Sequence, residues 1–403
     1  MYPKLRFKGF DDAWEQRKFK DVGTVSMCKR IFKEETSEEG DIPFFKIGTF
    51  GGIPDAFISR ELFDEYKSKY SYPEPGDILL SASGTIGRIV EYEGEEAYFQ
   101  DSNIVWLSHD KSVDNKFLKV LYSIVKWDGI EGSTIKRLYN DNFLKTQFML
   151  PSIEEQKKIG SFFEQLDNLI TLHQRQCEAL KKQKRFFLQN MFPKEGEAEP
   201  RIRFNGFTEP WEQRKLSSMC DVFTDGDWIE AKDQSDSGIR LVQTGNVGIA
   251  EYLDKENNKK WISEETFEHL HCSEIYPGDI LISRLPEPAG RACILPNIGT
   301  RMITAVDCTI VRSSKEYSSN YLVQYLSTSM YFKTVTAFLA GGTRQRISRG
   351  NLSEIDIPVP PSFEEQQKIG EFFSKIDKLI TLHQRQYEQL VSLKKYLLSK
   401  MFI

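Results

Sequence analysis

Two short loops of the chain combine glycine, hydroxyl and basic residues in a way that suits nucleic-acid binding. They are Gly132-Ser-Thr-Ile-Lys-Arg137 and Gly341-Gly-Thr-Arg-Gln-Arg346. Hydroxyl and guanidinium groups on a flexible backbone can contact both phosphates and base edges. The candidate DNA-contacting residues of these loops, and of the segment after the second one, are Ser133, Thr134, Lys136, Arg137, Thr343, Arg344, Arg346 and Arg349. A solvated surface loop is the alternative interpretation of both segments.

Two further arginines follow a turn-and-strand signature. Pro75-Gly-Asp-Ile-Leu79 precedes Gly87-Arg88, and Pro277-Gly-Asp-Ile-Leu281 precedes Gly290-Arg291. A Pro-Gly-Asp turn followed by apolar residues predicts entry into a buried strand. Arg88 and Arg291 are therefore placed just beyond a strand, where they are candidates either for DNA contact or for a role in the scaffold.

One segment loosely matches the acidic and lysine pattern of a metal-dependent nuclease, in which carboxylates hold Mg²⁺. It consists of Asp55, Glu65 and Lys67, but the corresponding positions of the second half lack these residue types. We also find no phosphate-binding loop and no amino-methyltransferase motif. His269 and His271 lack a third ligand at a useful spacing, so no metal site is predicted. We expect the chain to have no catalytic residues and no cofactor of its own.

The composition is typical of a globular protein rather than a membrane or disulfide-rich one. Hydrophobic residues make up 39% and charged residues 28% of the 403 residues, and the six cysteines form no Cys-x-x-Cys pair. No segment approaches the roughly 18 consecutive apolar residues of a membrane helix, and the N-terminus lacks a signal-peptide pattern. A cytoplasmic protein with buried thiols is expected. Because the net charge is -5, DNA-binding basic residues must be concentrated locally or supplied by partners.

An internal repeat organises the whole chain. Residues 151–192 and 361–402 are identical at about 25 aligned positions. A second match relates the Arg-Phe-x-Gly-Phe and Trp-Glu-Gln-Arg-Lys motifs within residues 6–18 to those within residues 203–215. The segments between these anchors differ greatly but keep the Pro-Gly-Asp turns in register. The chain is therefore a tandem duplication in which one scaffold carries two different surfaces.

The repeated segments 151–192 and 361–402 each predict a long helix. Ser152 and Ser362 are candidate N-caps, and acidic residues occupy the first turn. Apolar residues then recur at intervals of three and four, a pattern typical of helices that pair along a seam. The predicted pairing residues are Ile159, Phe163, Leu166, Ile170, His173, Leu180, Ile369, Phe373, Ile376, Ile380, His383 and Leu390. We expect an antiparallel coiled coil in which the two histidines are polar positions that fix the register.

The domain organisation follows from the repeat. We predict a first domain at residues 1–150, a first helix at 151–192, a linker at 193–200, a second domain at 201–360 and a second helix at 361–403. Short apolar runs broken by glycine indicate mostly β domains that also contain helices. The expected fold class is α+β, with two tandem mixed α/β domains separated by two long helices.

This organisation resembles the specificity subunit of type I restriction-modification enzymes over essentially the whole chain. The resemblance is carried by Pro151-Ser152, Glu155-Gln156 and Lys158-Ile159, by the same pattern at 361–369, and by the Gly-x-Thr loops that close each domain. It implies two target-recognition domains, each of which reads one half of a split sequence in double-stranded DNA. It also implies that the paired helices act as a ruler and as a docking site for methyltransferase subunits.

The resemblance further implies the partners and their cofactors. Two DNA adenine methyltransferase subunits are expected on the helices, and restriction and translocase subunits are expected to join through the complex. S-adenosylmethionine, ATP and Mg²⁺ are expected in those partner subunits and not in this chain, which is implied to be non-catalytic. The alternative is a coiled-coil scaffold that binds other proteins and never reads DNA.

Overall fold

The computed structural model describes residues 1–130, 136–341 and 345–402 of the chain. Its contacts divide the chain into two compact units. Unit 1 comprises Met1–Gln174 and Arg385–Ile403, and unit 2 comprises Arg175–Gln384. Both division points lie within a long helix, so each unit contains one sheet-rich domain and a part of each long helix. The domain limits expected at residues 150, 192, 200 and 360 stay a prediction.

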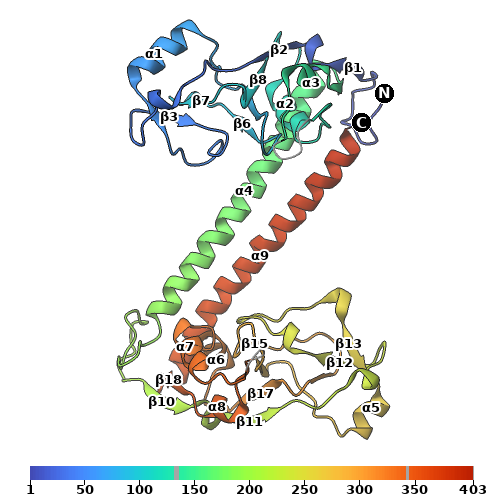
Figure 1. The fold of residues 1–403 in the computed structure, drawn as a ribbon. Helices are drawn as coiled ribbons and strands as arrows, with labels where there is room; N and C mark the ends of the chain where they lie inside the picture. Colours follow the sequence, from blue (N-terminus) through green and yellow to red (C-terminus); the bar gives the residue numbers. More distant parts are fainter. Residues whose placement is uncertain (131–135, 342–344, 403) are drawn as a thin grey trace. The chain divides into compact units, whose positions relative to one another are not determined.

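The described part of unit 1 is built on a main sheet, a smaller sheet and a two-stranded ribbon (Figure 1). Its strands are β1 (Glu15–Lys18), β2 (Gly23–Ser26), β3 (Ile42–Phe45), β4 (Phe57–Ile58), β5 (Ile78–Ser81), β6 (Ile89–Glu91), β7 (Tyr98–Phe99), β8 (Ile104–His109) and β9 (Gln147–Leu150). The main sheet has the order β2-β8-β5-β6 and is antiparallel, and the smaller sheet has the order β4-β3-β7. The ribbon pairs β1 with β9, so the first strand closes the domain against its last.

Unit 2 repeats this topology in its own described residues. Its strands are β10 (Glu212–Lys215), β11 (Cys220–Asp225), β12 (Ile239–Val242), β13 (Lys260–Ile262), β14 (Ile280–Ser283), β15 (Ala292–Ile294), β16 (Met302–Thr304), β17 (Cys308–Ser313) and β18 (Asp356–Val359). The main sheet has the order β11-β17-β14-β15, the smaller sheet has the order β13-β12-β16, and β10 pairs with β18. The smaller sheet contains one parallel pair in each unit, β3 with β7 and β12 with β16. The duplication seen in the sequence is therefore also a duplication of strand order.

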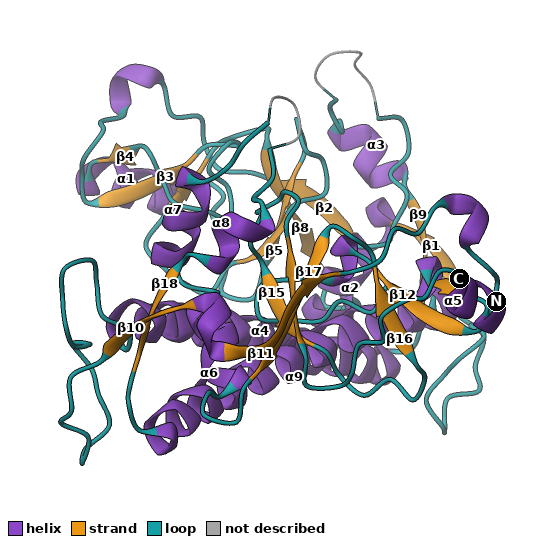
Figure 2. Ribbon diagram, turned by 90° about the horizontal axis from the view of Figure 1, so that it is seen from below, coloured by secondary structure: helices purple, strands orange, loops and turns teal. Residues whose placement is uncertain are grey.

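The described short α-helices other than α3 begin at side-chain caps, and the chain also contains two long helices (Figure 2). Unit 1 contains α1 (Arg60–Lys69), α2 (Asn115–Tyr122) and α3 (Asn140–Lys145), whereas unit 2 contains α5 (Glu264–His269), α6 (Ser319–Tyr325), α7 (Ser329–Ala337) and α8 (Arg349–Ser353). Asp114 caps α2 and Ser318 caps α6, because each accepts a hydrogen bond from a first-turn N–H. The long helices are α4 (Ile153–Asn190) and α9 (Phe363–Met401).

The Pro-Gly-Asp turns lead into central strands, which confirms the prediction made from their sequence. Gly76 and Gly278 each have a φ of 96°, a conformation that residues with side chains rarely adopt. The carboxylates of Asp77 and Asp279 each accept a hydrogen bond from the backbone N–H three residues earlier, which closes the turn. The strands that follow, β5 and β14, are buried along their whole length.

Within unit 1, the first part of α4 lies beside the last part of α9. Asp167 of α4 forms an ion pair with Lys394 of α9 at 2.5 Å. The ring of Phe163 lies 6.2 Å from the ring of Phe402, just beyond the end of α9. Because the earlier residue of α4 meets the later residue of this segment, the two run antiparallel. The end of α9 also reaches the start of the chain, since the N–H of Leu5 donates to the carbonyl of Lys400 (Figure 1).

Within unit 2, the second part of α4 lies beside the first part of α9. Lys184 forms an ion pair with Asp377 at 2.6 Å, and the ring of Phe187 lies 4.9 Å from that of Phe372. The helical segments of this unit also run antiparallel. The ion pair repeats that of unit 1 with the helices exchanged, because Asp377 is the counterpart of Asp167 and Lys184 is that of Lys394 in the repeat.

The predicted α+β class, with two tandem domains and two long helices, is confirmed.

All six cysteines are unpaired, and burial raises the pKa of the Cys28 thiol to about 12. Among the described residues, no helix combines the length and the apolar character needed to cross a membrane.

Candidate nucleic-acid interface

The segment that closes the domain of unit 1 returns to the end of the main sheet. Arg137 forms an isolated antiparallel bridge with Ser83, just after β5. The Arg137 guanidinium donates to the side-chain oxygen of Asn103 at 3.4 Å, and the Ser83 hydroxyl donates to the same oxygen at 2.7 Å. Arg137 and Lys136 are both exposed. This end of the sheet therefore offers an arginine, a lysine and an amide to a ligand in solvent.

The same frame in unit 2 carries a different set of charges. Arg346 takes the position of Arg137, and its guanidinium lies 3.9 Å from the carboxylate of Asp307. The guanidinium groups of Arg284 and Arg349 lie 3.4 Å and 3.8 Å from the carboxylate of Asp225. Three arginines and two aspartates thus meet at the end of the main sheet of unit 2.

Several participants in this arrangement are missing from the residues predicted from sequence, namely Asn103 in unit 1 and Asp225, Arg284 and Asp307 in unit 2. The N–H of Ala82 donates to the carbonyl of Asn103 in unit 1, and the N–H of Arg284 donates to the carbonyl of Asp307 in unit 2. These equivalent bonds show that Arg284 replaces Ala82 and that Asp307 replaces Asn103. Alignment of the two halves through their Pro-Gly-Asp turns could have found the first exchange, because it places Arg284 opposite Ala82.

A pocket of about 600 Å³ opens beside Arg137 in unit 1. It is lined by Met27, Ser102, Arg137, Leu138, Tyr139, Asn140, Asp141, Asn142 and Lys145. The lining supplies two cationic groups and two amides, and the Tyr139 side chain is 48% exposed. Such a mixture of donors and acceptors suits contact with phosphates and base edges.

The structure distinguishes the two arginines for which the sequence left contact and scaffold roles open. Arg291 is half-buried, and burial lowers the pKa of its guanidinium. Its nitrogens donate to four backbone carbonyls, those of Thr244, Val247, Leu285 and Pro288. Arg88 is exposed and donates to the carbonyl of Phe50. A scaffold role is therefore favoured for Arg291, whereas Arg88 can also face a ligand.

The structure describes three of the seven residues predicted in the two domain-closing loops, namely Lys136, Arg137 and Arg346. Ser133, Thr134, Thr343 and Arg344 lie outside the residues that the structure describes. Their contribution to DNA binding stays a prediction from sequence.

The predicted helix-pairing residues contribute to domain cores as well as to the helix pair. Ile159, Phe163 and Leu166 are buried in one cluster with Leu397 and Met401 of α9, and Ile170 and Leu390 pack against it. In unit 2, Ile369, Phe373 and Ile376 are buried with Met191 and Phe192, and Ile380 packs against this cluster. His173, Leu180 and His383 are half-buried. The first turns of each helix are thus part of the domain that precedes it.

A buried ion pair that was not predicted from the sequence attaches the start of each long helix to its domain. The guanidinium of Arg6 donates twice to the carboxylate of Glu155, at 2.7 Å in both bonds. Arg203 and Glu365 form the same bidentate pair in unit 2. The pair raises the pKa of each arginine, chiefly through the hydrogen bonds to its glutamate. The signal was present, because both partners belong to the repeated motifs.

The glutamine that follows each of these glutamates holds the loop before α2 or α6. The Gln156 side-chain oxygen accepts from the N–H of Asp114, and the Gln366 oxygen accepts from the N–H of Ser318. Four residues after each glutamine is a glycine, Gly160 or Gly370. A Cβ at Gly160 would lie 2.6 Å from a backbone nitrogen of α2, so a side chain there would force the two helices apart.

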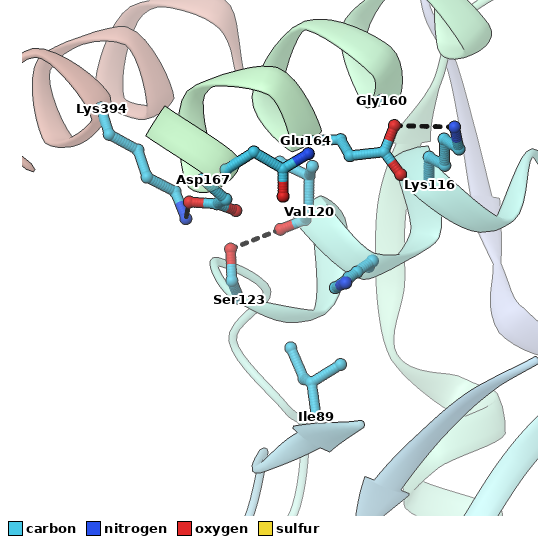
Figure 3. Close-up of a pocket in the computed structure, with 10 residues that line it drawn as sticks. Ile89, Lys116, Val120, Ser123, Gly160, Glu164, Asp167 and Lys394 are labelled. Atoms are coloured by element: carbon cyan, nitrogen blue, oxygen red, sulfur yellow. Dashed lines mark hydrogen bonds and ion pairs between the residues drawn. The ribbon is translucent and has the colours of Figure 1, made fainter. Parts of the chain in front are cut away.

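A small cavity of about 230 Å³ lies where α2 approaches the long helices of unit 1 (Figure 3). Each of its charged side chains forms an ion pair, and only that of Lys119 has its partner outside the lining. Lys116 pairs with Glu164 at 2.7 Å, and Lys394 pairs with Asp167. These ion pairs join α2 to α4 and α4 to α9 within unit 1.

The residues of the nuclease-like pattern do not converge in the structure. Asp55 pairs with Lys46 and Glu65 pairs with Lys69, while the ammonium group of Lys67 lies over the rings of Phe63 and Tyr72. Among the residues that are described, no group of three or more histidine, cysteine or acidic side chains is placed to hold a metal ion.

Two segments of the chain match one protein family. Residues 11–182 and 208–392 match the family model described as the type I restriction modification DNA specificity domain. A putative type I restriction enzyme specificity subunit of Haemophilus influenzae is 55% identical over 174 residues, which cover 42% of this chain and 45% of that protein. A putative type I restriction enzyme specificity subunit of Methanocaldococcus jannaschii is 26% identical over 427 residues, which cover 99% of this chain and 95% of that protein.

The fold is also similar to that of a solved structure. It is the S subunit of a type I restriction-modification system from M. genitalium, which matches with a TM-score of 0.66 over 100% of this chain and 99% of its own. The sequences are 14% identical, so the likeness concerns the fold.

Proposed function

Because the chain belongs to the family of type I restriction-modification DNA specificity proteins, we propose that each of its two specificity domains reads one half of a bipartite, asymmetric DNA sequence. The supporting observation is that one backbone frame occurs twice with different side chains at the same end of the main sheet. Arg137 lies beside Asn103 in unit 1, whereas Arg346 lies beside Asp307 in unit 2. Two different readers in one chain predict two unlike half-sites with unread bases between them.

The proposed DNA contacts are the basic and hydroxyl residues of the domain-closing segments. They are Ser133, Thr134, Lys136 and Arg137 in unit 1, and Thr343, Arg344, Arg346 and Arg349 in unit 2. Arginine can form two hydrogen bonds with guanine in the major groove, and lysine supplies a point charge to a phosphate. Arg88 is a further proposed contact, whereas Arg291 is not, because its donors are used inside the domain.

The long helices are the proposed docking surface for two DNA adenine methyltransferase subunits. An eight-residue stretch is identical in the two copies, at 169–176 and 379–386. Within it, Leu169, Leu172, Leu379 and Leu382 are between 44% and 49% exposed. Because the same exposed leucines occur once in each long helix, the chain offers two equivalent binding sites, one for each copy of the same partner. Restriction and translocase subunits would then join through the assembled complex.

In this proposal the chain itself is non-catalytic and acts in the cytoplasm, where its DNA target is accessible. S-adenosylmethionine would be bound by the methyltransferase subunits, and ATP and Mg²⁺ by the restriction and translocase subunits. The chain would supply the position on DNA at which these subunits act.

The test is a map of DNA methylation. The chain would be co-expressed with its methyltransferase partner in a host without adenine methylation, and methylated adenines would be mapped across the genome. We expect one motif with two unlike half-sites separated by a fixed number of unread bases. The control culture lacks this chain and should show no such motif.

Two outcomes would contradict the proposal. Methylation of the same motif without this chain would place recognition in the partner. Assembly with the partner but methylation without sequence preference would favour the alternative, a coiled-coil scaffold that does not read DNA. A double variant, Leu172→Glu with Leu382→Glu, should lose capture of the methyltransferase, which tests the docking surface separately.

A further inference from the structure

Trp228 is the most exposed tryptophan among the described residues. Its side chain is 71% exposed, whereas Trp14, Trp106 and Trp211 are buried. It lies in the loop that follows β11, the first strand of the main sheet of unit 2. A large apolar side chain in this position loses the free energy of burial unless a ligand covers it.

The backbone beneath Trp228 is firmly held. The N–H of Asp227 donates to the carbonyl of Thr304, and the carbonyl of Asp227 accepts from the N–H of Val306. The Asp227 carboxylate also accepts from the N–H of Ser273 at 2.8 Å. The indole is therefore presented from an anchored backbone, which lowers the entropy lost when a ligand orders it.

The loop lies at the end of the sheet where the arginines of unit 2 meet. Asp225 is the last residue of β11, directly before the loop, and its carboxylate is 3.4 Å from Arg284 and 3.8 Å from Arg349. Asp227 forms a bridge with Ala305, and Asp307 of the same turn lies beside Arg346. Trp228 thus shares one end of the domain with the proposed DNA contacts.

The equivalent loop of unit 1 places a cation in the same position. In the strand register, Met27, the residue after β2, corresponds to Asp225, the last residue of β11. Three residues further along each loop, Arg30 corresponds to Trp228. Arg30 is exposed and donates to the carboxylate of Asp101 at 2.9 Å, in the turn that precedes β8. Met27 also lines the pocket beside Arg137. Both loops therefore contact the turn that precedes a central strand, β8 in unit 1 and β17 in unit 2.

We propose that this loop, at residues 27–33 in unit 1 and 225–231 in unit 2, is a second base-reading element of each domain, with Arg30 and Trp228 as its reading side chains. The inference rests on the proposed function, because it assigns further specificity-determining residues to the same DNA surface. It extends that surface from the domain-closing segment to a loop more than a hundred residues earlier in each half.

The two loops differ in charge, and this difference defines what each can read. Residues 27–33 contain three basic residues, Lys29, Arg30 and Lys33, whereas residues 225–231 contain three acidic ones, Asp225, Asp227 and Glu230. A basic loop gains affinity from phosphates as well as from guanine. An acidic loop gains nothing from phosphates, so the indole contributes through apolar contact with a thymine methyl group, a sugar or a base step.

The experiment uses the full chain assembled with its methyltransferase partner. DNA duplexes would carry single base-pair substitutions through both half-sites, and dissociation constants would be measured for wild type, Trp228→Ala, Trp228→Phe and Arg30→Ala. We expect Trp228→Ala to bind the preferred duplex about 5- to 100-fold more weakly and to lose discrimination at one or two positions of a single half-site. Trp228→Phe should retain most of both properties, and Arg30→Ala should change the other half-site.

The possible outcomes distinguish a failure of this inference from a failure of the proposed function. Unchanged affinity and discrimination in Trp228→Ala would overturn the inference while leaving a discriminating wild type in place. Loss of methyltransferase capture in Trp228→Ala would assign the indole to a protein interface and would also overturn it. A wild-type complex that discriminates between no two duplexes would instead refute the proposed function. Because the side chain is exposed, thermal unfolding of the variants should match that of wild type.

Discussion

The two units share the contacts that attach the long helices to their domains, but they differ at the end of the main sheet. Arg6 with Glu155 and Arg203 with Glu365 form the same bidentate ion pair around an almost inaccessible carboxylate. At the sheet end, by contrast, an amide in unit 1 is replaced by the carboxylate of Asp307 in unit 2. Buried ion pairs tolerate little change, whereas exposed charges cost little to exchange. The duplication has kept the first kind of contact and altered the second.

Even the shared attachment is not equal in the two units. The indole Nε1–H of Trp14 donates to Glu155 at 3.1 Å, so this carboxylate is bound by two side chains. The corresponding Trp211 is buried, and its Nε1 has no hydrogen-bond partner in the described structure. An unsatisfied buried donor costs free energy. The attachment of α4 in unit 1 should therefore be the stronger of the two.

The largest expected effect tests whether the long helix is attached more strongly in unit 1 than in unit 2. Glu155→Ala leaves a largely buried guanidinium and a buried indole N–H without their partner, and we expect it to lower the free energy of unfolding by about 3–5 kcal/mol. Glu365→Ala removes only the ion pair and should cost less. Hydrogen exchange of β1 and β10, measured on each full-length variant, reports the loss in each unit separately.

The matched control for this pair is Arg17→Ala, which removes an exposed ion pair with Glu15 in the same motif. Exchange in β1 and β10 should remain close to wild type in that variant. An equal or larger loss in Glu365→Ala than in Glu155→Ala would show that the indole hydrogen bond contributes nothing to the attachment.

The second effect concerns the sheet end. Arg137→Ala should weaken DNA binding by about 1–3 kcal/mol if its guanidinium contacts a base edge. If the guanidinium contacts a phosphate, the variant should instead lower by about one the slope of the logarithm of the binding constant against the logarithm of the salt concentration. Arg346→Ala should cost less, because the carboxylate of Asp307 at 3.9 Å already offsets part of its charge. Dissociation constants at two salt concentrations would measure both terms. Identical losses in the two variants would contradict the proposed role of the carboxylate.

The smallest effect concerns the turns at Asp77 and Asp279. Asp279 accepts two hydrogen bonds from Arg312 at 2.7 Å, whereas Ser108 stands at the position of that arginine in unit 1. Burial raises the pKa of the Asp77 carboxyl. A raised pKa in the folded state favours the protonated form, so unit 1 gains stability as the pH falls through this pKa and loses it as the pH rises.

Asp77→Asn should remove that dependence, with a change of less than about 1 kcal/mol at neutral pH. Asp279→Asn should instead destabilise unit 2 at neutral pH, because Arg312 loses its charged partner. Thermal unfolding between about pH 4 and pH 7 would compare the two variants. If the stability difference between wild type and Asp77→Asn grew in favour of wild type as the pH rose, the assigned sign would be reversed.

Much of the fold could be predicted from local patterns in the sequence. The long helices begin at Ile153 and Phe363, each within two residues of the Pro-Ser step that predicted the start. The Pro-Gly-Asp turns precede buried strands in both halves. These features depend on capping, turn geometry and periodicity, which act over a few residues and are therefore legible in the chain itself.

The candidate site was only partly predictable. Arg137 and Arg346 were identified as basic residues in matching loops, but their neighbours Asn103 and Arg284 were not. Arg291 was equivalent to Arg88 in sequence, yet its donors are used inside the domain. No local pattern distinguishes an exposed arginine that donates to one backbone carbonyl from a half-buried one that donates to four.

What the amino-acid sequence determined by itself is the duplication, the helix starts and the class of side chain available at each loop. Only the tertiary structure decided which of these side chains meet. The register of β5 on β8 and of β14 on β17 brings the ends of distant segments together, so that Arg284, Arg346 and Asp307 become neighbours in unit 2. Such long-range pairings depend on the packing of the whole sheet, and a chain read residue by residue carries no local signal of them.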